Sequence, residues 1–262
     1  MRLPARIRSL ATALVGRAPL RVRGGPNRGL RWSAASSGRG YISGRFEEVR
    51  LRRLVALSRE GAVCWDVGAH KGYVTLALAR ASGAFGRVVA VEPAPDNVAM
   101  LRRHLAWNRI VNVRVVEAAV GATDGATRFG GGGSSISYRI GGGSLDVRML
   151  SLPSLLREVG GPAADLLKLD VEGEEVRVLE SAGAAIGPHS AVCVAVHSPA
   201  HYRACAALLR SRGMRIAHSG PIEAWRSSSR WRGDPDLVGI GPAHPLFCSD
   251  LAALDLHPVA GD

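Results

Sequence analysis

The sequence predicts an α/β protein with a Rossmann-like, doubly wound and mostly parallel sheet. Three observations indicate this fold class: short apolar runs alternate with helical patterns from residue 61 onward, a glycine-rich turn follows the first run, and a carboxylate ends the second. A chain of 262 residues with 47% hydrophobic content is long enough for one sizeable core. We expect seven strands, with the last one antiparallel.

Each expected element follows from local periodicity. The apolar runs that predict strands are 62–68, 87–93, 112–120, 165–171, 191–198, 214–219 and 236–242. The helical patterns between them are 73–82, 95–108, 152–159, 173–183 and 202–213. In the second helix, Val98, Leu101 and Leu105 share one face, which is typical of a helix packed on a sheet.

Residues 121–151 interrupt this alternation. Two glycine runs flank the alternating segment Ser135–Ile140, and glycine runs resist regular structure. We predict an inserted hairpin or lid within the α/β domain of residues 61–262, and a disordered surface excursion is the alternative. Residues 1–60 are predicted to form a basic N-terminal extension that ends in an amphipathic lead-in helix.

Composition narrows the setting of the protein. The longest apolar runs fall far short of the roughly 18 residues that a membrane span requires. The net charge of +12 attracts anions such as nucleic acid, acidic lipid or phosphorylated small molecules. We expect the basic N-terminus to form a solvated helix on the domain edge, and peripheral contact with an anionic membrane is the alternative. Four scattered cysteines without C-x-x-C spacing predict reduced thiols in a cytoplasmic protein.

The segment "DVGAHKG", residues 66–72, lies where the first strand turns into a helix. Glycines at such a turn let the backbone approach a cofactor closely, and the helix N–H groups are free there. The spacing is not the dinucleotide G-x-G-x-x-G, and a turn without a ligand would use the same residues. Glu92 ends the second strand, where a carboxylate can accept hydrogen bonds from both hydroxyls of a ribose. A ligand that contains adenosine is therefore expected.

With these motifs in place, the chain resembles the class I S-adenosylmethionine-dependent methyltransferases, and most closely the FkbM family. The resemblance covers about residues 61–200. It rests, in order, on "DVGAHKGY", "VEPAPDN", Asn108, "EAAVGATDG" and "KLDVEGEEVRVLESA". Two positions depart from the family pattern: His70 stands where Asn is common, and Pro153 replaces the Asp of the usual "tLDsl".

The resemblance implies S-adenosylmethionine as the cofactor. The first loop would lie under its methionine part, Glu92 would hold its ribose, and Glu117 with Ala118 would lie beside its adenine. The cofactor-binding residues expected in this way are Asp66, Gly68, Ala69, His70, Gly72, Tyr73, Glu92, Asn97, Glu117 and Ala118.

The run "DLLKLDVEGEE" places charges in and after a buried strand. Because alternate strand residues share a face, Lys168 and Asp170 should point one way and the flanking leucines the other. Asp170 and Glu172 emerge at the carboxyl end of the strand, where ligands bind in open α/β sheets. A structural Lys168–Asp170 ion pair is the alternative. For Glu174 and Glu175 we expect only a favourable interaction with the dipole of the next helix.

Methyl transfer to a neutral hydroxyl needs a base near the acceptor oxygen. The candidate catalytic residues are Asp170, Glu172, His197 and Lys168. His197 has the intrinsic pKa best suited to a base, although a histidine at a strand end is often only structural. Asp170 and Glu172 could instead hold a divalent metal with the oxygens of the substrate, but nothing in the spacing requires a metal.

The connection between the last two strands carries tryptophans and arginines. Trp225 and Trp231 suit a sugar ring or an aromatic acceptor, and the adjacent arginines suit carboxylate or phosphate groups. We interpret this connection as a loop on the substrate side, with an exposed basic loop as the alternative.

The favoured function is O-methylation of a hydroxyl on a small molecule, glycan or lipid-linked sugar, with an anionic acceptor as one option. An RNA methyltransferase is the main alternative, because of the positive charge, although no RNA-binding module accompanies it. A nicotinamide-dependent oxidoreductase is disfavoured by the missing G-x-G-x-x-G. A noncatalytic binding protein on the same fold is also compatible with the sequence, since fold does not fix function.

Overall fold

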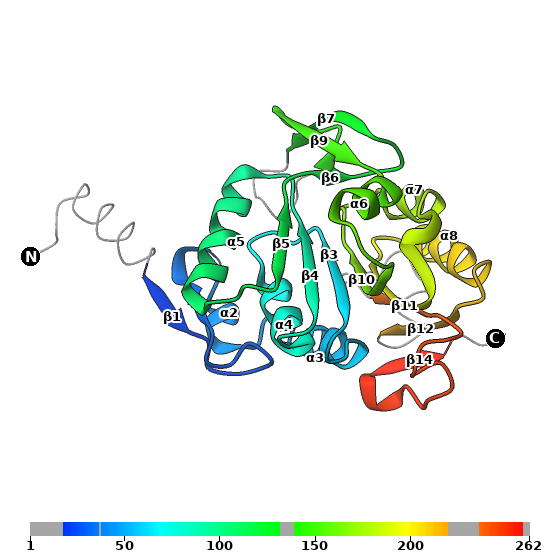
Figure 1. Ribbon diagram of the computed structural model, residues 1–262, viewed down its shortest axis with the longest axis horizontal. Coiled ribbons are helices and arrows are strands. Elements are labelled where there is room, and N and C mark those ends of the chain that lie inside the picture. The colour runs from blue at the N-terminus through cyan, green and yellow to red at the C-terminus, as the bar shows by residue number, and fades with distance from the viewer. Residues whose placement is uncertain (1–17, 37, 132–138, 220–235, 259–262) are drawn as a thin grey trace, which may run out of the picture.

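The computed structural model describes residues 18–36, 38–131, 139–219 and 236–258. Its centre is an eight-stranded sheet (Figure 1). Across the sheet the strands are β14 (Leu256–Pro258), β12 (Arg215–Ser219), β13 (Asp236–Ile240), β11 (Ile186–Ala195), β10 (Ala164–Leu169), β3 (Val63–Val67), β4 (Arg87–Val91) and β5 (Val113–Val116).

Strand directions agree with the predicted doubly wound sheet. Strands β5, β4, β3, β10 and β11 are parallel to one another, and β13 lies antiparallel between β11 and β12. The seven predicted strands and the antiparallel one among them are therefore confirmed. The short β14 was not predicted; it adds an antiparallel edge strand beside β12.

Helices cover both faces of the sheet because side chains alternate along each buried strand. On one face, Leu167 and Leu169 pack with α6 (Leu152–Val159), α7 (Glu175–Glu180) and α8 (Pro199–Arg210). On the other, Leu166 packs in a cluster that includes residues of α3 (Glu48–Leu57) and α4 (Tyr73–Ser82). The long α5 (Pro95–Asn108) joins α4 in a third cluster. The sheet is thus buried on both sides, as a parallel sheet requires.

Helix ends follow local capping. The predicted bounds of α4, α5 and α6 are correct. Helix α6 tolerates Pro153 in its first turn, where no intrahelical N–H is needed, and the Ser151 side chain caps the helix by accepting from the Ser154 N–H. Helix α8 begins three residues earlier than predicted, because Ser198 caps it and Pro199 opens it. The predicted 173–183 helix is shorter, since α7 is followed by the 3₁₀ turn η3 (Gly183–Ala185).

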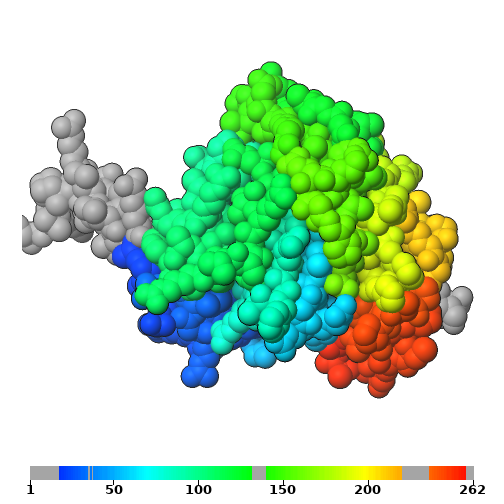
Figure 2. All heavy atoms as spheres, in the orientation of Figure 1, coloured from blue at the N-terminus to red at the C-terminus, as the bar shows by residue number. Residues whose placement is uncertain are grey.

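The predicted third strand divides in two. β5 ends at Val116, and β6 (Ala119–Val120) leaves the central sheet to pair with β9 (Leu145–Leu150). Together with β7 (Gly125–Gly130) and β8 (Arg139–Ile140), these strands form a separate four-stranded sheet. The predicted insertion of residues 121–151 is therefore a sheet that β6 also joins, and part of its alternating segment Ser135–Ile140 lies outside the described residues. Its residues form the top of the molecule in Figure 2.

The N-terminal segment docks on α5. The strands β1 (Pro19–Arg21) and β2 (Arg31–Ser33) form an antiparallel ribbon, followed by η1 (Ala34–Ser36) and α2 (Arg39–Ser43). Asn108 holds the ribbon through two hydrogen bonds with the backbone of Arg31, of 2.7 and 2.9 Å. Trp32 is fully buried and stacks on the His104 ring at 3.8 Å. Residues 18–36 and 38–43 therefore form part of the wall beside the sheet.

His104 gives this wall a dependence on pH. Its Nε2 accepts from the Ser33 N–H at 3.1 Å, and its Nδ1 lies 2.8 Å from the Lys71 carbonyl, so the neutral ring fits the site. Burial lowers the pKa of His104 from 6.5 to about 4. A lowered histidine pKa means that the unfolded state binds the proton first, so stability is lost as pH falls below 6.5.

We expect the free energy of unfolding to fall by about 1 kcal/mol from the His104 contribution between pH 7.5 and 5.5. Urea unfolding of the wild type and of His104→Gln at both pH values measures it. The variant should lose about 1 kcal/mol less than the wild type over this interval. An identical loss in the two proteins would show that His104 is not the titrating group.

Within the described ranges, no helix combines the length and hydropathy that crossing a bilayer requires. The four cysteines are free thiols: Cys64, Cys193 and Cys205 are buried, and Cys248 is exposed. Residues 1–17, which carry most of the basic N-terminus, lie outside the described residues.

Candidate active site

A cavity of about 600 Å³ opens at the carboxyl ends of β3, β4 and β10. This volume lies within the range of about 300–1,000 Å³ that is usual for small-molecule sites. The N-terminal segment and the insertion complete its walls. The residues around it include Tyr41, Phe46, Glu47, Arg50, Gly68, Ala69, His70, Lys71, Glu92, Pro93, Ala118, Val120, Phe129, Ile140, Lys168, Asp170 and Glu172.

The loop after β3 forms the floor of the cavity. The N–H groups of Gly68 and Ala69 donate to the Val91 carbonyl at 3.0 and 2.9 Å, which turns the loop toward β4. Gly68 has a φ of +78°, and a Cβ there would collide with the Asp170 carbonyl. This position therefore requires glycine, because the loop backbone lies directly against the end of β10.

Other residues predicted in this loop lie behind the cavity. Gly72 also has a positive φ, of +90°, but a Cβ there would meet Leu101 of α5, so this glycine serves helix packing. The Tyr73 hydroxyl donates to the Tyr41 carbonyl at 3.1 Å and so ties α4 to the N-terminal segment. His70 does line the cavity, and burial lowers its pKa to about 4, which keeps the ring neutral.

Glu92 is buried with its carboxylate at the cavity. Its Oε2 accepts from the His70 N–H at 2.8 Å, and its Oε1 accepts from the Ala94 N–H at 3.1 Å and from the Asn97 amide at 2.9 Å. Burial raises the pKa of Glu92, and these hydrogen bonds partly oppose the shift. Asn97 therefore positions the Glu92 carboxylate and does not itself line the cavity. A fixed acidic side chain here can accept from ribose hydroxyls.

Glu117 and Ala118, the two residues predicted to lie beside adenine, follow β5 but differ in where their side chains lie. Ala118 lines the cavity together with Ala119 and Val120. The Glu117 side chain points to solvent, with 43% of it exposed, and lies 3.8 Å from Arg102. Only Ala118 of this pair is therefore placed to contact a ligand in the cavity. Phe129 and Ile140, paired across β7 and β8, bring the insertion to the same side.

Lys168 links β10 to β3. Its Nζ lies 3.3 Å from Asp66 Oδ1 and 3.6 Å from Asp170 Oδ2, and it donates to the Gly68 carbonyl at 2.8 Å. The predicted common face of Lys168 and Asp170 is confirmed by this contact. The Thr75 hydroxyl donates to Asp66 Oδ2 at 2.6 Å, so the two Asp66 oxygens contact Thr75 and Lys168, and Asp66 is not among the residues that line the cavity. Burial disfavours the ammonium of Lys168, but Asp170 and Asp66 outweigh it and raise its pKa.

Asp170 is a carboxylate held by cations. Burial alone would raise its pKa, but the charges of Lys168 and Arg50 dominate and lower the pKa to about 2. A group with this pKa is ionised at neutral pH and accepts a proton poorly. Among the candidate bases Asp170 is therefore the weakest, and its charge is better suited to orienting its neighbours.

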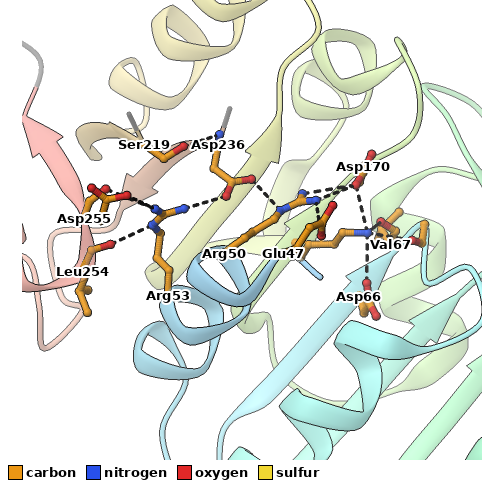
Figure 3. A network of polar contacts seen from close by, with 12 residues as sticks. Glu47, Arg50, Arg53, Asp66, Val67, Asp170, Ser219, Asp236, Leu254 and Asp255 are labelled. Atoms are coloured by element: carbon orange, nitrogen blue, oxygen red, sulfur yellow. Dashed lines mark hydrogen bonds and ion pairs between the residues drawn. The ribbon is translucent and has the colours of Figure 1, made fainter. Parts of the chain in front are cut away.

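Arg50 of α3 is a site residue that the sequence did not suggest. Its guanidinium lies 3.3 Å from Asp170 Oδ2, 3.3 Å from Glu47 Oε2 and 2.9 Å from Asp236 Oδ1 (Figure 3). Arg53 continues the network through Asp236 Oδ2 at 2.9 Å and the Leu254 carbonyl at 3.0 Å, which belongs to η5 (Ala252–Leu254). The sequence held one indication that these arginines are buried. Arg50 and Arg53 fall on the same helical face as the apolar residues Leu54 and Leu57.

The loop after β10 folds around Glu175. Its Oε1 accepts from the Val171 N–H at 2.8 Å, and its Oε2 accepts from the Gly173 N–H at 3.1 Å. His197 Nε2 lies 3.4 Å from Oε1. Glu175 is fully buried, so the expectation that it acts only through the helix dipole is wrong. Glu174 is different, since it pairs with Arg177 on the surface at 3.3 Å.

The two remaining candidate bases differ in position. Glu172 lines the cavity in a left-handed conformation with a φ of +56°. His197 follows β11 and lies beside Asp170 and Glu175, outside the set of residues that line the cavity. The predicted substrate loop with Trp225, Trp231 and their neighbouring arginines lies outside the described residues.

The parallel sheet, with a glycine loop beside a buried acidic residue, is an arrangement with which α/β proteins bind cofactors that contain a nucleoside. Residues 66–216 match the model of the methyltransferase FkbM domain. Because this match spans more than half of the chain, the protein belongs to the FkbM methyltransferase family. S-adenosylmethionine is therefore the expected cofactor, and the cavity beside Glu92 has the size and the acidic acceptor that it needs.

Several solved structures are similar to this chain. An FkbM methyltransferase from Methylobacillus flagellatus KT is 19% identical with a TM-score of 0.46, over 68% of this chain and 43% of that one. An S-adenosylmethionine-dependent O-methyltransferase from Thermotoga maritima is 13% identical with a TM-score of 0.49, over 74% and 64%. Precorrin-6y C5,15-methyltransferase from Geobacter metallireducens GS-15 is 13% identical with a TM-score of 0.47, over 74% and 87%. No curated protein sequence matches the chain.

Proposed function

We propose that the protein transfers the methyl group of S-adenosylmethionine to a hydroxyl of a small molecule, a glycan or a lipid-linked sugar. The observation that carries the proposal is the cavity itself, which has the ribose acceptor Glu92 on one side and the charged group around Asp170 on the other. A cofactor held by Glu92 would direct its reacting end toward the ends of β10 and β11, where the polar side chains gather.

Each part of the cavity has a separate task in this proposal. Glu92 would accept from the ribose hydroxyls, and the backbone of Gly68 and Ala69, which lines the same cavity, would hold the methionine part. Ala118 and Phe129 provide an apolar surface for the adenine ring. The bound cofactor supplies an electrophilic methyl group on a sulfonium.

Methyl transfer to a neutral hydroxyl would also require a residue of this chain to take up the hydroxyl proton. Asp170 is a poor base, with a pKa of about 2. Because Glu172 lines the cavity, it is our first candidate for this base. His197 lies beside Asp170 and is the second candidate for this step.

The walls contributed by the N-terminal segment support an acceptor that carries a ring. Tyr41 and Phe46 stack at 3.8 Å and both border the cavity, and such aromatic faces suit sugars and aromatic rings. Lys71, whose Nζ donates to the Ser36 carbonyl at 2.8 Å, adds a cation that favours an acidic acceptor.

The four free cysteines support a cytoplasmic location.

The competing function is methylation of RNA, which the net charge of +12 favours. Transfer of labelled methyl groups from the cofactor distinguishes the two. We expect label in hydroxylated small molecules or nucleotide sugars, as an ether that resists mild base, and none in bulk RNA. The same assay with Glu92→Gln shows how much of the transfer depends on this site. Label in RNA, with none in the small molecules, would contradict the proposal.

A further inference from the structure

Glu175 is a buried carboxylate whose partners at ion-pair distance in the described part of the chain are histidines. It is fully buried at the start of α7, and the residues at ion-pair distance from it are His197 at 3.4 Å and His201 at 3.5 Å. Among the described residues, no lysine or arginine pairs with it. Its two backbone hydrogen bonds, from Val171 and Gly173, fix its position. A carboxylate that is removed from water is costly to keep ionised unless it is paired, so a cation bound beside Glu175 would be favourable.

Asp170 and His197 converge on the same point. One ligand atom from each of Asp170, Glu175 and His197 lies within 4.8 Å of the others. In the described part of the chain, the ion pairs and hydrogen bonds of Asp170 all involve Oδ2, which takes both Arg50 and Lys168. The other oxygen, Oδ1, is available for a ligand. The cluster therefore offers two carboxylate oxygens and one imidazole nitrogen.

The fold explains why these three residues meet. Asp170 follows β10 and His197 follows β11, and neighbouring parallel strands bring their carboxyl ends to one edge of the sheet. Glu175 reaches back from α7 over the loop of residues 171–173. Because Asp170 also lines the cavity, the cluster borders the position at which the acceptor would react.

We propose that Asp170, Glu175 and His197 bind a divalent cation at the edge of the cavity. Two carboxylates with one imidazole form a mixed oxygen and nitrogen donor set that suits Mn²⁺. The sequence had suggested at most a pair of Asp170 with Glu172, but the structure brings Glu175 and His197 to Asp170 instead. The cation would supply a positive charge beside Glu175.

The cation would also have a catalytic role in the proposed function. Only this catalytic role rests on the proposed function. An acceptor hydroxyl bound to a divalent cation is more acidic, so a weak base is enough to remove its proton. With His197 engaged as a ligand, Glu172 is left to take that proton. Binding of the cation itself requires neither the cofactor nor the acceptor.

Titration of the chelator-treated, full-length protein with Mn²⁺ tests the site, with the electron paramagnetic resonance signal of free Mn²⁺ as the readout. We expect one equivalent to bind with micromolar affinity. Removing one ligand in Glu175→Gln or His197→Ala should weaken binding by at least about tenfold, since even changes in supporting residues cost 10–100-fold. Glu172→Gln is the matched control and should bind as the wild type does.

Two results would overturn the proposal. One is the absence of a stoichiometric site tighter than millimolar in the wild type, which would mean that the cluster does not hold a divalent cation. The other is equal affinity in the wild type and His197→Ala. His197 is partly exposed in the wild type, and the His197→Ala variant keeps the buried Glu175. A change in Mn²⁺ affinity in this variant therefore reflects loss of a ligand and not loss of the fold. Because no cofactor is present, failure of this titration leaves methyl transfer to be judged by its own assay.

Discussion

Replacing Lys168 with methionine is expected to lower the free energy of unfolding by about 3–5 kcal/mol. Lys168 is buried between Asp66 and Asp170, and Asp66 has no exposed surface. Methionine fills the same space but leaves the Asp66 carboxylate buried without a cation. Urea unfolding followed by circular dichroism measures the change.

Two controls show whether the charge is the cause. Arg52→Met breaks an exposed ion pair with Glu48 and should cost about 0.5 kcal/mol or less. Adding Asp66→Asn to Lys168→Met should recover part of the lost stability, because the unpaired charge is then removed. A cost for Lys168→Met as small as that of Arg52→Met would show that the buried pair contributes little.

The second large effect is on cofactor affinity. Glu92→Gln should weaken binding of S-adenosylmethionine by about tenfold to hundredfold, because hydrogen bonds to a charged group contribute about 1.5–3 kcal/mol. Glutamine keeps the shape of the side chain but removes its charge and one of its acceptors. The binding constant can be measured by competition with the demethylated product.

Glu117→Gln provides the matched comparison for Glu92→Gln. Glu117 also follows a parallel strand of the large sheet, but its side chain is exposed and does not line the cavity. We expect unchanged affinity in this variant. If both variants lose affinity equally, the loss does not depend on a ribose contact that Glu92 alone makes. If neither does, Glu92 does not hold the ribose.

Periodicity was sufficient to predict most of the fold. The alternation of leucines around Lys168 and the helical pattern of residues 95–108 both follow from which faces of the element are buried. Such a pattern is visible within the sequence of one segment. The division of the third strand at Glu117 could not be predicted in this way. Ala119 and Val120 are apolar in either sheet, and only their partners Met149 and Leu150 decide which sheet they join.

The site was predictable where one loop supplies it and unpredictable where distant segments meet. Gly68 and Glu92 fall in recognisable turns after strands, and both border the cavity. Arg50 reaches Asp170 from 120 positions away in the chain, a contact that no local pattern encodes. Glu175 resembled an ordinary residue of a helix start, because its burial depends on the approach of His197 from the next strand.

The most direct test of the central claim, that this cavity holds S-adenosylmethionine, is calorimetric titration of the wild-type protein. The ligands are S-adenosylmethionine, its demethylated product and, for comparison, NADH. We predict micromolar binding of both sulfur compounds at one site per chain and no binding of NADH. Failure of both sulfur compounds to bind protein that is shown to be folded would contradict the claim, and the cavity would then belong to another ligand.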